Sequence, residues 1–242
     1  MVPTRLHDAT CPSCGHAFTV TLVDGPHLSR VPDVRKQLVA GTFQAFACPA
    51  CGATIAFEAA SIFMDFERRE YLANETRRSA TWQAAVARHQ TLFHNAFELG
   101  PPIAQELAQG FTKRVVYGLR AMREKLVLWD AGLSDVAVEA VKGDLLAAAG
   151  EKPRDVVLRI AEILDGGHLL FAVFPPTAAP PAELADGAAW GATLPAPLDF
   201  ATATAAQYAL RADEPARIGR DYPWLENDWL VDLHDGPSYL YR

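Results

Sequence analysis

Two copies of one five-residue pattern constrain this chain more than any other feature. Residues 11–15 read C-P-S-C-G and residues 48–52 read C-P-A-C-G, and together they contain all four cysteines of the chain. Proline after the first cysteine presets a turn with φ of about −65°, and glycine after the second tolerates positive φ. Two such turns that face each other supply four thiolates in a tetrahedron, the usual ligand set of a structural zinc ion.

We therefore predict one metal ion bound by Cys11, Cys14, Cys48 and Cys51. Zinc is the expected metal, and iron remains an alternative because geometry alone does not separate the two in a four-thiolate site. A redox-active dithiol or thiol sensor that uses one of the two motifs is a second alternative. Two disulfides are a third, which the reducing interior of a cell disfavours.

Three histidines lie where a further ligand could be considered. His16 follows Cys14 by two residues, but four thiolates already complete a structural site, so we expect a surface residue. His89 lies on the apolar face of a predicted helix, where we expect a hydrogen-bonded core histidine. His234 could bind a cation together with nearby aspartates, although an exposed acidic segment is the expected structure there. These aspartates are Asp228, Asp232 and Asp235.

Hydrophobic residues alternate with polar ones directly after the first motif and before the second. The alternation predicts strands at residues 18–23 and 43–47, with a short helix at residues 34–39 between them. These elements fill the 33 residues between Cys14 and Cys48, which is more than a minimal zinc ribbon holds. We infer that the metal joins structural elements and does not make the whole fold.

The strand pattern continues after the second motif. Residues 55–59 predict another strand, and residues 62–66 and 71–73 predict a hairpin whose tip is the charged stretch 67–70. The two cysteine motifs are therefore expected at the edge of a small antiparallel sheet.

Helical periodicity replaces the strand pattern in the middle of the chain. Apolar residues recur at helical spacing over residues 82–97, and Gly100, followed by two prolines, ends that helix. A second apolar stripe predicts another helix, and Ser134 caps a third one at residues 135–149. The second stripe consists of Val115, Leu119, Met122, Leu126 and Trp129.

Strand patterns return in the C-terminal third. Residues 156–164 and 168–174 predict two strands joined by a turn at residues 165–167. Residues 175–197 are rich in proline and alanine, so a loop or linker is expected there.

The order of these patterns predicts an α+β fold. We expect a zinc-ribbon-like antiparallel sheet, then helices, and then a second β-rich C-terminal portion. We place the domain boundary between a zinc-knuckle domain with a helical extension, residues 1–149, and a β-rich acidic region, residues 150–242.

The net charge of −7 arises in the C-terminal half, where residues 131–242 include 17 acidic and 8 basic side chains. A nucleic-acid-binding protein normally has a basic face, so binding to nucleic acid is not expected. One local basic cluster is expected to line a solvated hairpin edge. It consists of Arg68, Arg69, Arg77 and Arg78.

The chain has neither an apolar run long enough for a transmembrane helix nor a secretory signal in residues 1–10. We therefore expect a soluble, cytoplasmic protein with no membrane contact.

The residues around the motifs resemble the CpXC family of bacterial proteins. The resemblance rests on the doubled C-P-x-C-G, on G-T-F at residues 41–43, on L-R-A-M-R-E-K-L at residues 119–126 and on W-D-A-G-L at residues 129–133. It covers roughly residues 7–130. The family has no assigned activity, so the resemblance carries over only the four cysteines.

The chain lacks the H-E-x-x-H, G-x-S-x-G, P-loop and G-x-G-x-x-G motifs of common enzyme classes. We therefore expect a zinc-stabilised scaffold, more readily a non-enzyme than an enzyme, that binds a protein partner or associates with itself. The C-terminal aromatic residues would form the contact surface or, alternatively, the protein's own core. They are Tyr222, Trp224, Trp229, Tyr239 and Tyr241.

Overall fold

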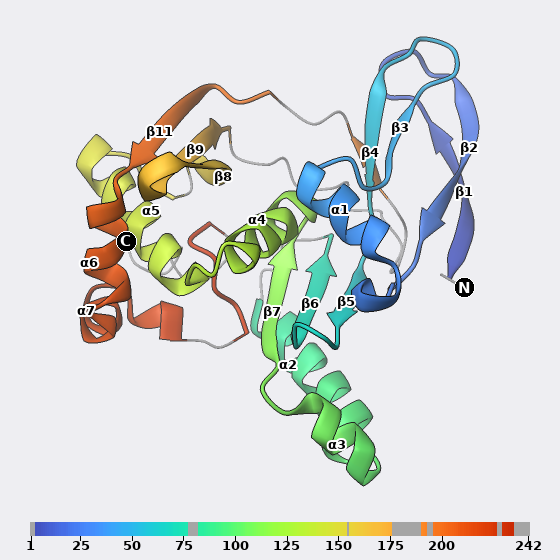
Figure 1. The fold of residues 1–242 in the computed structure, drawn as a ribbon. Helices are drawn as coiled ribbons and strands as arrows, with labels where there is room; N and C mark the ends of the chain where they lie inside the picture. Colours follow the sequence, from blue (N-terminus) through green and yellow to red (C-terminus); the bar gives the residue numbers. More distant parts are fainter. Residues whose placement is uncertain are drawn as a thin grey trace. The chain divides into compact units, whose positions relative to one another are not determined.

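The structure is a computed structural model, and it confirms the α+β class, with helices and four small sheets among the residues that it describes (Figure 1). These are residues 3–76, 82–153, 155–175, 190–192, 196–226 and 229–234.

Residue contacts divide the chain into two compact units, and the division falls inside helix α4. The N-terminal unit comprises Met1–Arg123 and Ala179–Leu194, and the C-terminal unit comprises Glu124–Ala178 and Pro195–Arg242. Contact grouping does not measure independent folding, so the boundary after residue 149 stays a prediction.

Two β-hairpins carry the cysteine motifs in the N-terminal unit. Strand β1 (Thr4–Thr10) pairs antiparallel with β2 (Ala17–Val23), and β3 (Ala45–Ala47) pairs antiparallel with β4 (Thr54–Glu58). Each connection between paired strands is one C-P-x-C-G motif. We call the two hairpins together the finger. Strand β1 was not predicted, and β10 (Trp190–Ala192), which pairs with the other edge of β4, lies in the segment predicted to be a linker.

The finger has a small hydrophobic core of its own. Phe57 is buried at its centre, and the rings of His7, Phe18 and Phe46 lie edge-on to the Phe57 ring at 5.6–6.5 Å between centroids. Buried apolar surface therefore supports the hairpins in addition to any bound metal. The other buried members are Ala9, Cys11, Val20, Leu22, Cys48, Ile55 and Ala59.

The predicted helix between the hairpins is α1 (Pro32–Ala40). Proline at its first position suits a helix start, and Gly41 ends it in the left-handed conformation at φ 71°. Its Arg35 guanidinium forms a buried ion pair with Glu70 at 2.6 Å and lies 3.5 Å from the carboxylate of Asp65. Helix α1 is thereby held against the predicted hairpin at residues 62–73.

That hairpin is confirmed as β5 (Ser61–Asp65) and β6 (Glu70–Glu75). A third strand, β7 (Thr112–Tyr117), pairs with β6 in the parallel direction, so the sheet is mixed. The prediction that Val115 belongs to a helix is therefore wrong. The helical stripe begins only at α4 (Leu119–Asp130), since the buried edge of β6 recruits the preceding residues into the sheet.

The crossover from β6 to β7 forms an arm. It consists of α2 (Trp82–Phe93), a π-helical turn η2 (His94–Glu98) and α3 (Pro102–Ala108). The predicted helix at residues 82–97 is thus confirmed, and α3 was not predicted. A crossover of this kind is what a parallel strand pair requires.

The C-terminal unit is built on α5 (Asp135–Ala149), which begins and ends as predicted. The Ser134 hydroxyl accepts a hydrogen bond from the Ala137 N–H at 3.2 Å, and Gly150 ends the helix at φ 73°. Strands β8 (Val157–Leu164) and β9 (His168–Phe174) form the predicted hairpin.

The C-terminal portion is less purely β than its sequence predicted. Strand β11 (Asp199–Ala203) adds to β9 and completes a three-stranded antiparallel sheet. Two unpredicted helices follow it, α6 (Ala205–Ala212) and α7 (Pro215–Asp221). Residues 176–189 and 193–195 of the predicted linker lie outside the described residues.

Candidate metal centre

The two cysteine motifs fold into turns with matching hydrogen bonds. In the first turn, the Cys11 N–H donates to the His16 carbonyl at 2.8 Å, and the Gly15 N–H donates to the Cys11 carbonyl at 2.9 Å. Cys48 and Gly52 repeat both bonds in the second turn. The two glycines adopt φ of 74° and 73°, so the predicted need for positive φ is met.

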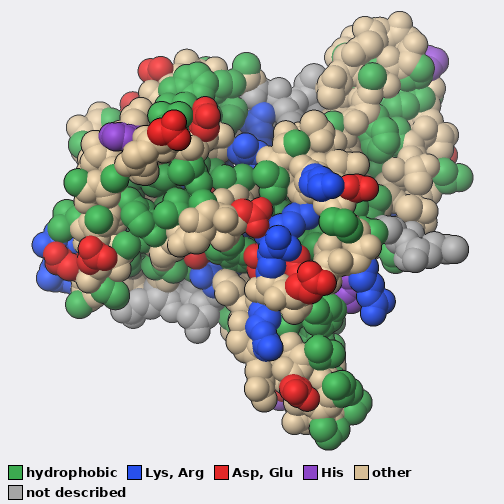
Figure 2. Space-filling view, in the orientation of Figure 1, with side chains coloured by type: hydrophobic (Ala, Val, Ile, Leu, Met, Phe, Trp, Pro, Cys, Tyr) green, Lys and Arg blue, Asp and Glu red, His purple; other side chains and the backbone are tan. Residues whose placement is uncertain are grey.

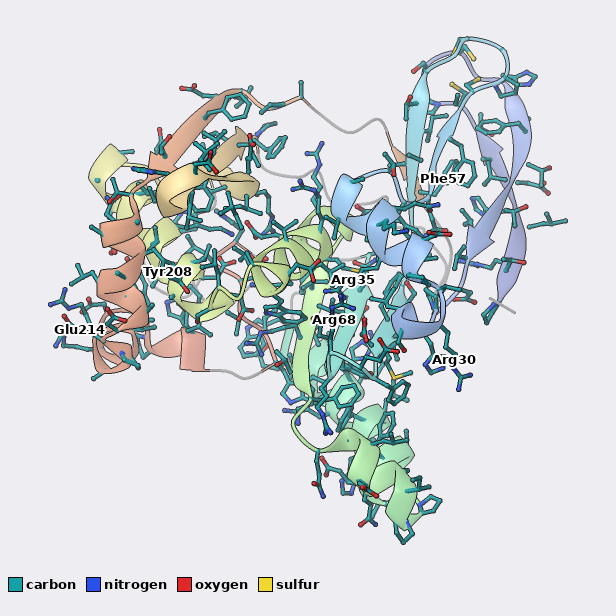
Figure 3. All side chains as sticks on the ribbon, in the orientation of Figure 1. Arg30, Arg35, Phe57, Arg68, Tyr208 and Glu214 are labelled. Atoms are coloured by element: carbon teal, nitrogen blue, oxygen red, sulfur yellow. The ribbon has the colours of Figure 1, made fainter. Side chains whose placement is uncertain are left out.

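Packing of the two hairpins against each other brings the four cysteines together. One ligand atom from each cysteine lies within 4.8 Å of all the others, and two sulfur pairs, Cys11–Cys51 and Cys14–Cys48, are 3.7 Å apart. Cys11 and Cys48 are buried, whereas Cys14 and Cys51 are exposed. Sulfur atoms gather at the end of the finger in Figure 3. This set is positioned to hold a metal ion, and its four soft thiolates suit zinc or iron.

The pKa values of two cysteines in the cluster shift in opposite directions, down for Cys11 and up for Cys14. Burial opposes ionisation of Cys11, but backbone N–H groups of Ser13 and Cys14 donate hydrogen bonds to it and lower its pKa to about 6. A backbone N–H of His16 favours the thiolate of Cys14, but Cys51, together with burial, raises the pKa of Cys14 to about 12. Negative charges this close repel each other, and a divalent cation at their centre would remove that repulsion.

His16 lies outside this cluster. Its side chain is exposed and stacks on Phe18 with 6.4 Å between ring centroids, as expected for a surface residue.

The predicted basic cluster is only partly described. Arg68 forms an ion pair with Asp65 at 3.4 Å, and Arg69 donates to the Gln109 carbonyl. Arg77 and Arg78 lie outside the described residues. The two described arginines thus have partners within the N-terminal unit and line the hairpin edge.

His89 is the core histidine that the sequence predicted. Its Nε2 lies 2.6 Å from the Glu75 carboxylate and its Nδ1 lies 3.3 Å from the Tyr71 hydroxyl. Burial, with a smaller contribution from the Glu75 charge, raises the pKa of Tyr71 to about 12. The contacts of His89 with Glu75 and Tyr71 join α2 to β6. They explain why a polar side chain lies on the apolar face of this helix.

The prediction of an exposed acidic segment around His234 is wrong for the residues that the structure describes. Both Asp232 and His234 are fully buried in the C-terminal unit, and Asp228 and Asp235 lie outside the described residues. Among the described residues, only the four cysteines form a group that could hold a metal. Asp232 pairs with the Arg159 guanidinium at 2.7 Å instead of lining a cation site.

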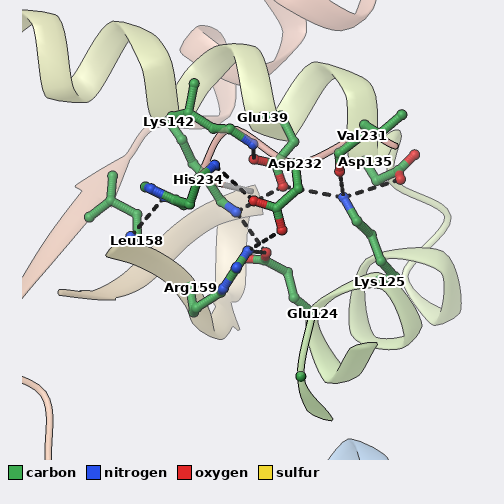
Figure 4. Close-up of polar contacts among 12 residues, drawn as sticks. Glu124, Lys125, Asp135, Glu139, Lys142, Leu158, Arg159, Val231, Asp232 and His234 are labelled. Carbon is green, nitrogen blue, oxygen red and sulfur yellow. Dashed lines mark hydrogen bonds and ion pairs between the residues drawn. The ribbon is translucent and has the colours of Figure 1, made fainter. Parts of the chain in front are cut away.

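Asp232 belongs to a buried ionic network that sequence analysis missed (Figure 4). Lys142 pairs with Glu124 at 2.6 Å and with Glu139 at 2.9 Å, and Arg159 pairs with Glu124 at 3.1 Å. Lys125 pairs with Glu139 at 3.2 Å. The available signal lay in α5, where Glu139 and Lys142 stand among alanines, valines and leucines, because charges buried in an apolar helix require partners.

The network also holds the segment that contains His234. The Lys125 ammonium donates to the Val231 carbonyl, and the Glu139 carboxylate accepts from the Leu233 N–H at 2.9 Å. The His234 Nε2 accepts from the Leu158 N–H at 3.0 Å. The segment is therefore bound to α4, α5 and β8 by side chains and backbone groups together.

Loss of stability at acidic pH should follow from His234. Burial, with a smaller contribution from Arg159, lowers its pKa to about 3, against about 6.5 in an unfolded chain. Between these values the unfolded chain binds one more proton, so the unfolding free energy of the C-terminal unit falls as pH falls. From pH 7 to pH 5 we expect His234 to account for about 2 kcal/mol of this loss.

Urea unfolding at both pH values measures this loss. In His234→Gln the loss should shrink by that amount, whereas the exposed control His168→Gln should leave it unchanged. An equal loss in wild type and His234→Gln would contradict the assignment.

The C-terminal tryptophans belong to the core of their unit. Trp224 and Trp229 are 9% and 8% exposed, and Tyr222 packs against the same hydrophobic cluster. Tyr239 and Tyr241 lie outside the described residues. The alternative that these aromatics fill the protein's own core is therefore the one that applies to the described members.

In the part of the chain that the structure describes, every helix is too short or too polar to cross a membrane.

Comparison with known proteins identifies a family that has both cysteine motifs within the matched residues. A family model described as CpXC protein matches residues 9–142, which is more than half of the chain and includes most of the finger, the whole arm and the first half of α5. Neither the curated proteins nor the solved structures contain a match to this chain. The matched residues include the four clustered cysteines, so the chain belongs to the CpXC family.

Proposed function

We propose that this protein is a non-enzymatic scaffold whose finger is held in shape by one zinc ion and which binds another protein. One observation carries the proposal: the only four cysteines of the chain come from two separate hairpins and lie within 4.8 Å of one another. Cys11, Cys14, Cys48 and Cys51 would be the ligands. Zinc is preferred to iron because it suits structural four-thiolate sites without redox chemistry.

A closed site of this type argues against catalysis at the metal. Catalytic zinc keeps one position for water or substrate, whereas four protein thiolates fill a tetrahedron. The metal would then act by joining the two hairpins, whose tips are 34 or more residues apart in sequence.

The surface of the finger supports a protein partner more than a nucleic acid. The turns that carry the cysteines contain Pro12, Ser13, Pro49 and Ala50, and no lysine or arginine. Nucleic-acid binding needs basic side chains that neutralise phosphates. An uncharged tip is better suited to contact with another polypeptide.

Elemental analysis and thiol titration test the proposal together. Protein purified without a chelator should contain about one zinc per chain, and its thiols should react slowly with an alkylating reagent until the metal is removed. All four thiols should then react. Metal-free protein with reduced thiols would contradict the metal site, and one rapidly alkylated cysteine in metal-free protein would support the redox-dithiol alternative instead.

A further inference from the structure

The arm of the N-terminal unit carries an exposed apolar surface. Leu92, Leu99, Ile103 and Leu107 are 45%, 68%, 63% and 45% exposed. They account for half of the large hydrophobic residues that are exposed in the described part of the chain. Hydrophobic side chains gather at the end of the arm in Figure 2. We call these four residues the arm patch. Contiguous exposed apolar side chains mark interaction sites.

Spacing places two members of the patch on one face of α3. Ile103 and Leu107 are four residues apart in this helix, which contains no buried residue, and Leu99 lies in the turn that leads into it. Residues four apart lie on the same side of a helix. Helix α3 therefore has an apolar face that the described residues of its unit leave exposed.

The arm is a structured element. At its base the Phe93 and Phe97 rings are 4.9 Å apart, and both lie near the Phe111 ring at 5.9 and 6.2 Å. At the turn into α3, the Gln105 amide donates to the Gly100 carbonyl at 3.0 Å. The patch is therefore presented by packed helices. The π-helical turn before it is a feature that often accompanies functional sites.

Two exposed carboxylates lie in the segment that carries the patch. Residues 89–112 contain Glu98 and Glu106 but neither lysine nor arginine, and Glu98 lies 2.7 Å from the Nδ1 of His94. An anionic lipid surface would be repelled by these carboxylates. Two copies of the arm patch packed against each other would bring four carboxylates, Glu98 and Glu106 of each copy, to one interface, which disfavours a symmetric dimer.

We propose that the arm patch binds an amphipathic helix of a partner protein, with leucine-like side chains on one face and lysine or arginine beside them. The apolar face of the partner would cover Leu99, Ile103 and Leu107, and its basic residues would meet Glu98 and Glu106. Helices that lie in apolar grooves or on apolar faces use anchors at this spacing. The inference extends the proposed scaffold function and does not depend on which metal the finger holds.

Two synthetic peptides of about 18 residues, or five helical turns, provide the test. Both have leucines at helical spacing, with lysines elsewhere in one and glutamates elsewhere in the other. Fluorescence anisotropy should show that full-length protein binds the lysine peptide and not the glutamate peptide. Because the whole chain is acidic, attraction by charge alone must be separated from binding at the patch.

Matched variants separate binding at the arm patch from attraction by charge alone. Leu99→Ser/Ile103→Ser leaves the charge unchanged and should weaken binding of the lysine peptide by about tenfold or more, as should Glu98→Gln/Glu106→Gln. Leu6→Ser changes a leucine that is 77% exposed on β1 and should have no effect. Circular dichroism and metal content, measured on each sample, separate this result from a failure of the finger.

Three results would overturn the proposal. One is equal binding of both peptides, and another is binding that survives the serine substitutions. The third is self-association in sedimentation that Leu99→Ser/Ile103→Ser abolishes, because the occupant would then be a second copy of this chain.

Discussion

Glu124→Gln should lower the unfolding free energy of the C-terminal unit by about 3–5 kcal/mol. The carboxylate of Glu124 pairs with Lys142 and Arg159 and also accepts a hydrogen bond from the Ile160 N–H at 2.6 Å. Burial disfavours its charge, but Lys142 and Arg159 outweigh that effect and keep the pKa of Glu124 below its usual value. The amide keeps the shape and removes the charge, so two buried cations lose a partner.

Amide hydrogen exchange in α5 and β8, together with urea unfolding, measures this loss at neutral pH. Glu162→Gln is the matched control, because Glu162 is exposed on β8, and surface substitutions change stability by about 0.5 kcal/mol or less. An unfolding free energy in Glu124→Gln within that range of wild type would show that the network does not stabilise the unit.

Cys48→Ser should release the metal and loosen the finger while the C-terminal unit stays folded. Structural zinc contributes roughly 10–16 kcal/mol to folding in small peptides. The loss here should be smaller, because the hairpins also bury a hydrophobic core around Phe57. Metal content should fall well below one per chain, and amides of β1–β4 should exchange at least about tenfold faster.

Ser13→Ala is the control for this experiment, since it changes the first turn and keeps all four cysteines. It should retain the metal and the exchange protection of wild type. If Cys48→Ser kept both as well, the four cysteines would not act as one metal site. Accelerated exchange in α5 or β8 would instead show that the two units depend on each other.

Helix caps and turns were predictable because their causes lie within a few residues. Ser134 and Gly150 bound α5 as expected, and residues 165–167 join β8 to β9. A side chain that accepts a hydrogen bond three residues ahead, or a glycine that tolerates positive φ, acts wherever the rest of the chain folds. The hairpin turns at the cysteines are local in the same way.

Elements that depend on distant partners were not predictable in this way. Val115 fits the apolar stripe of the following helix as well as a strand, and only the parallel pairing of β7 with β6 decides for the strand. Strand β1 is recognisable through its antiparallel partner β2. Helix α6 is attached to α5 by Arg211, whose guanidinium donates to the Asp144 carboxylate at 2.6 and 2.8 Å. These two residues are 67 positions apart in the sequence.

The sequence by itself determined the candidate metal ligands and the family, because four cysteines in two repeated turns leave one plausible set. Only the tertiary structure decided where the charged residues lie. Lys125 looks like a surface residue, yet its ammonium meets the Val231 carbonyl 106 residues away. Pairing over such distances depends on the packing of α4, α5 and β8, and side-chain type alone cannot distinguish a solvated charge from a buried, compensated one.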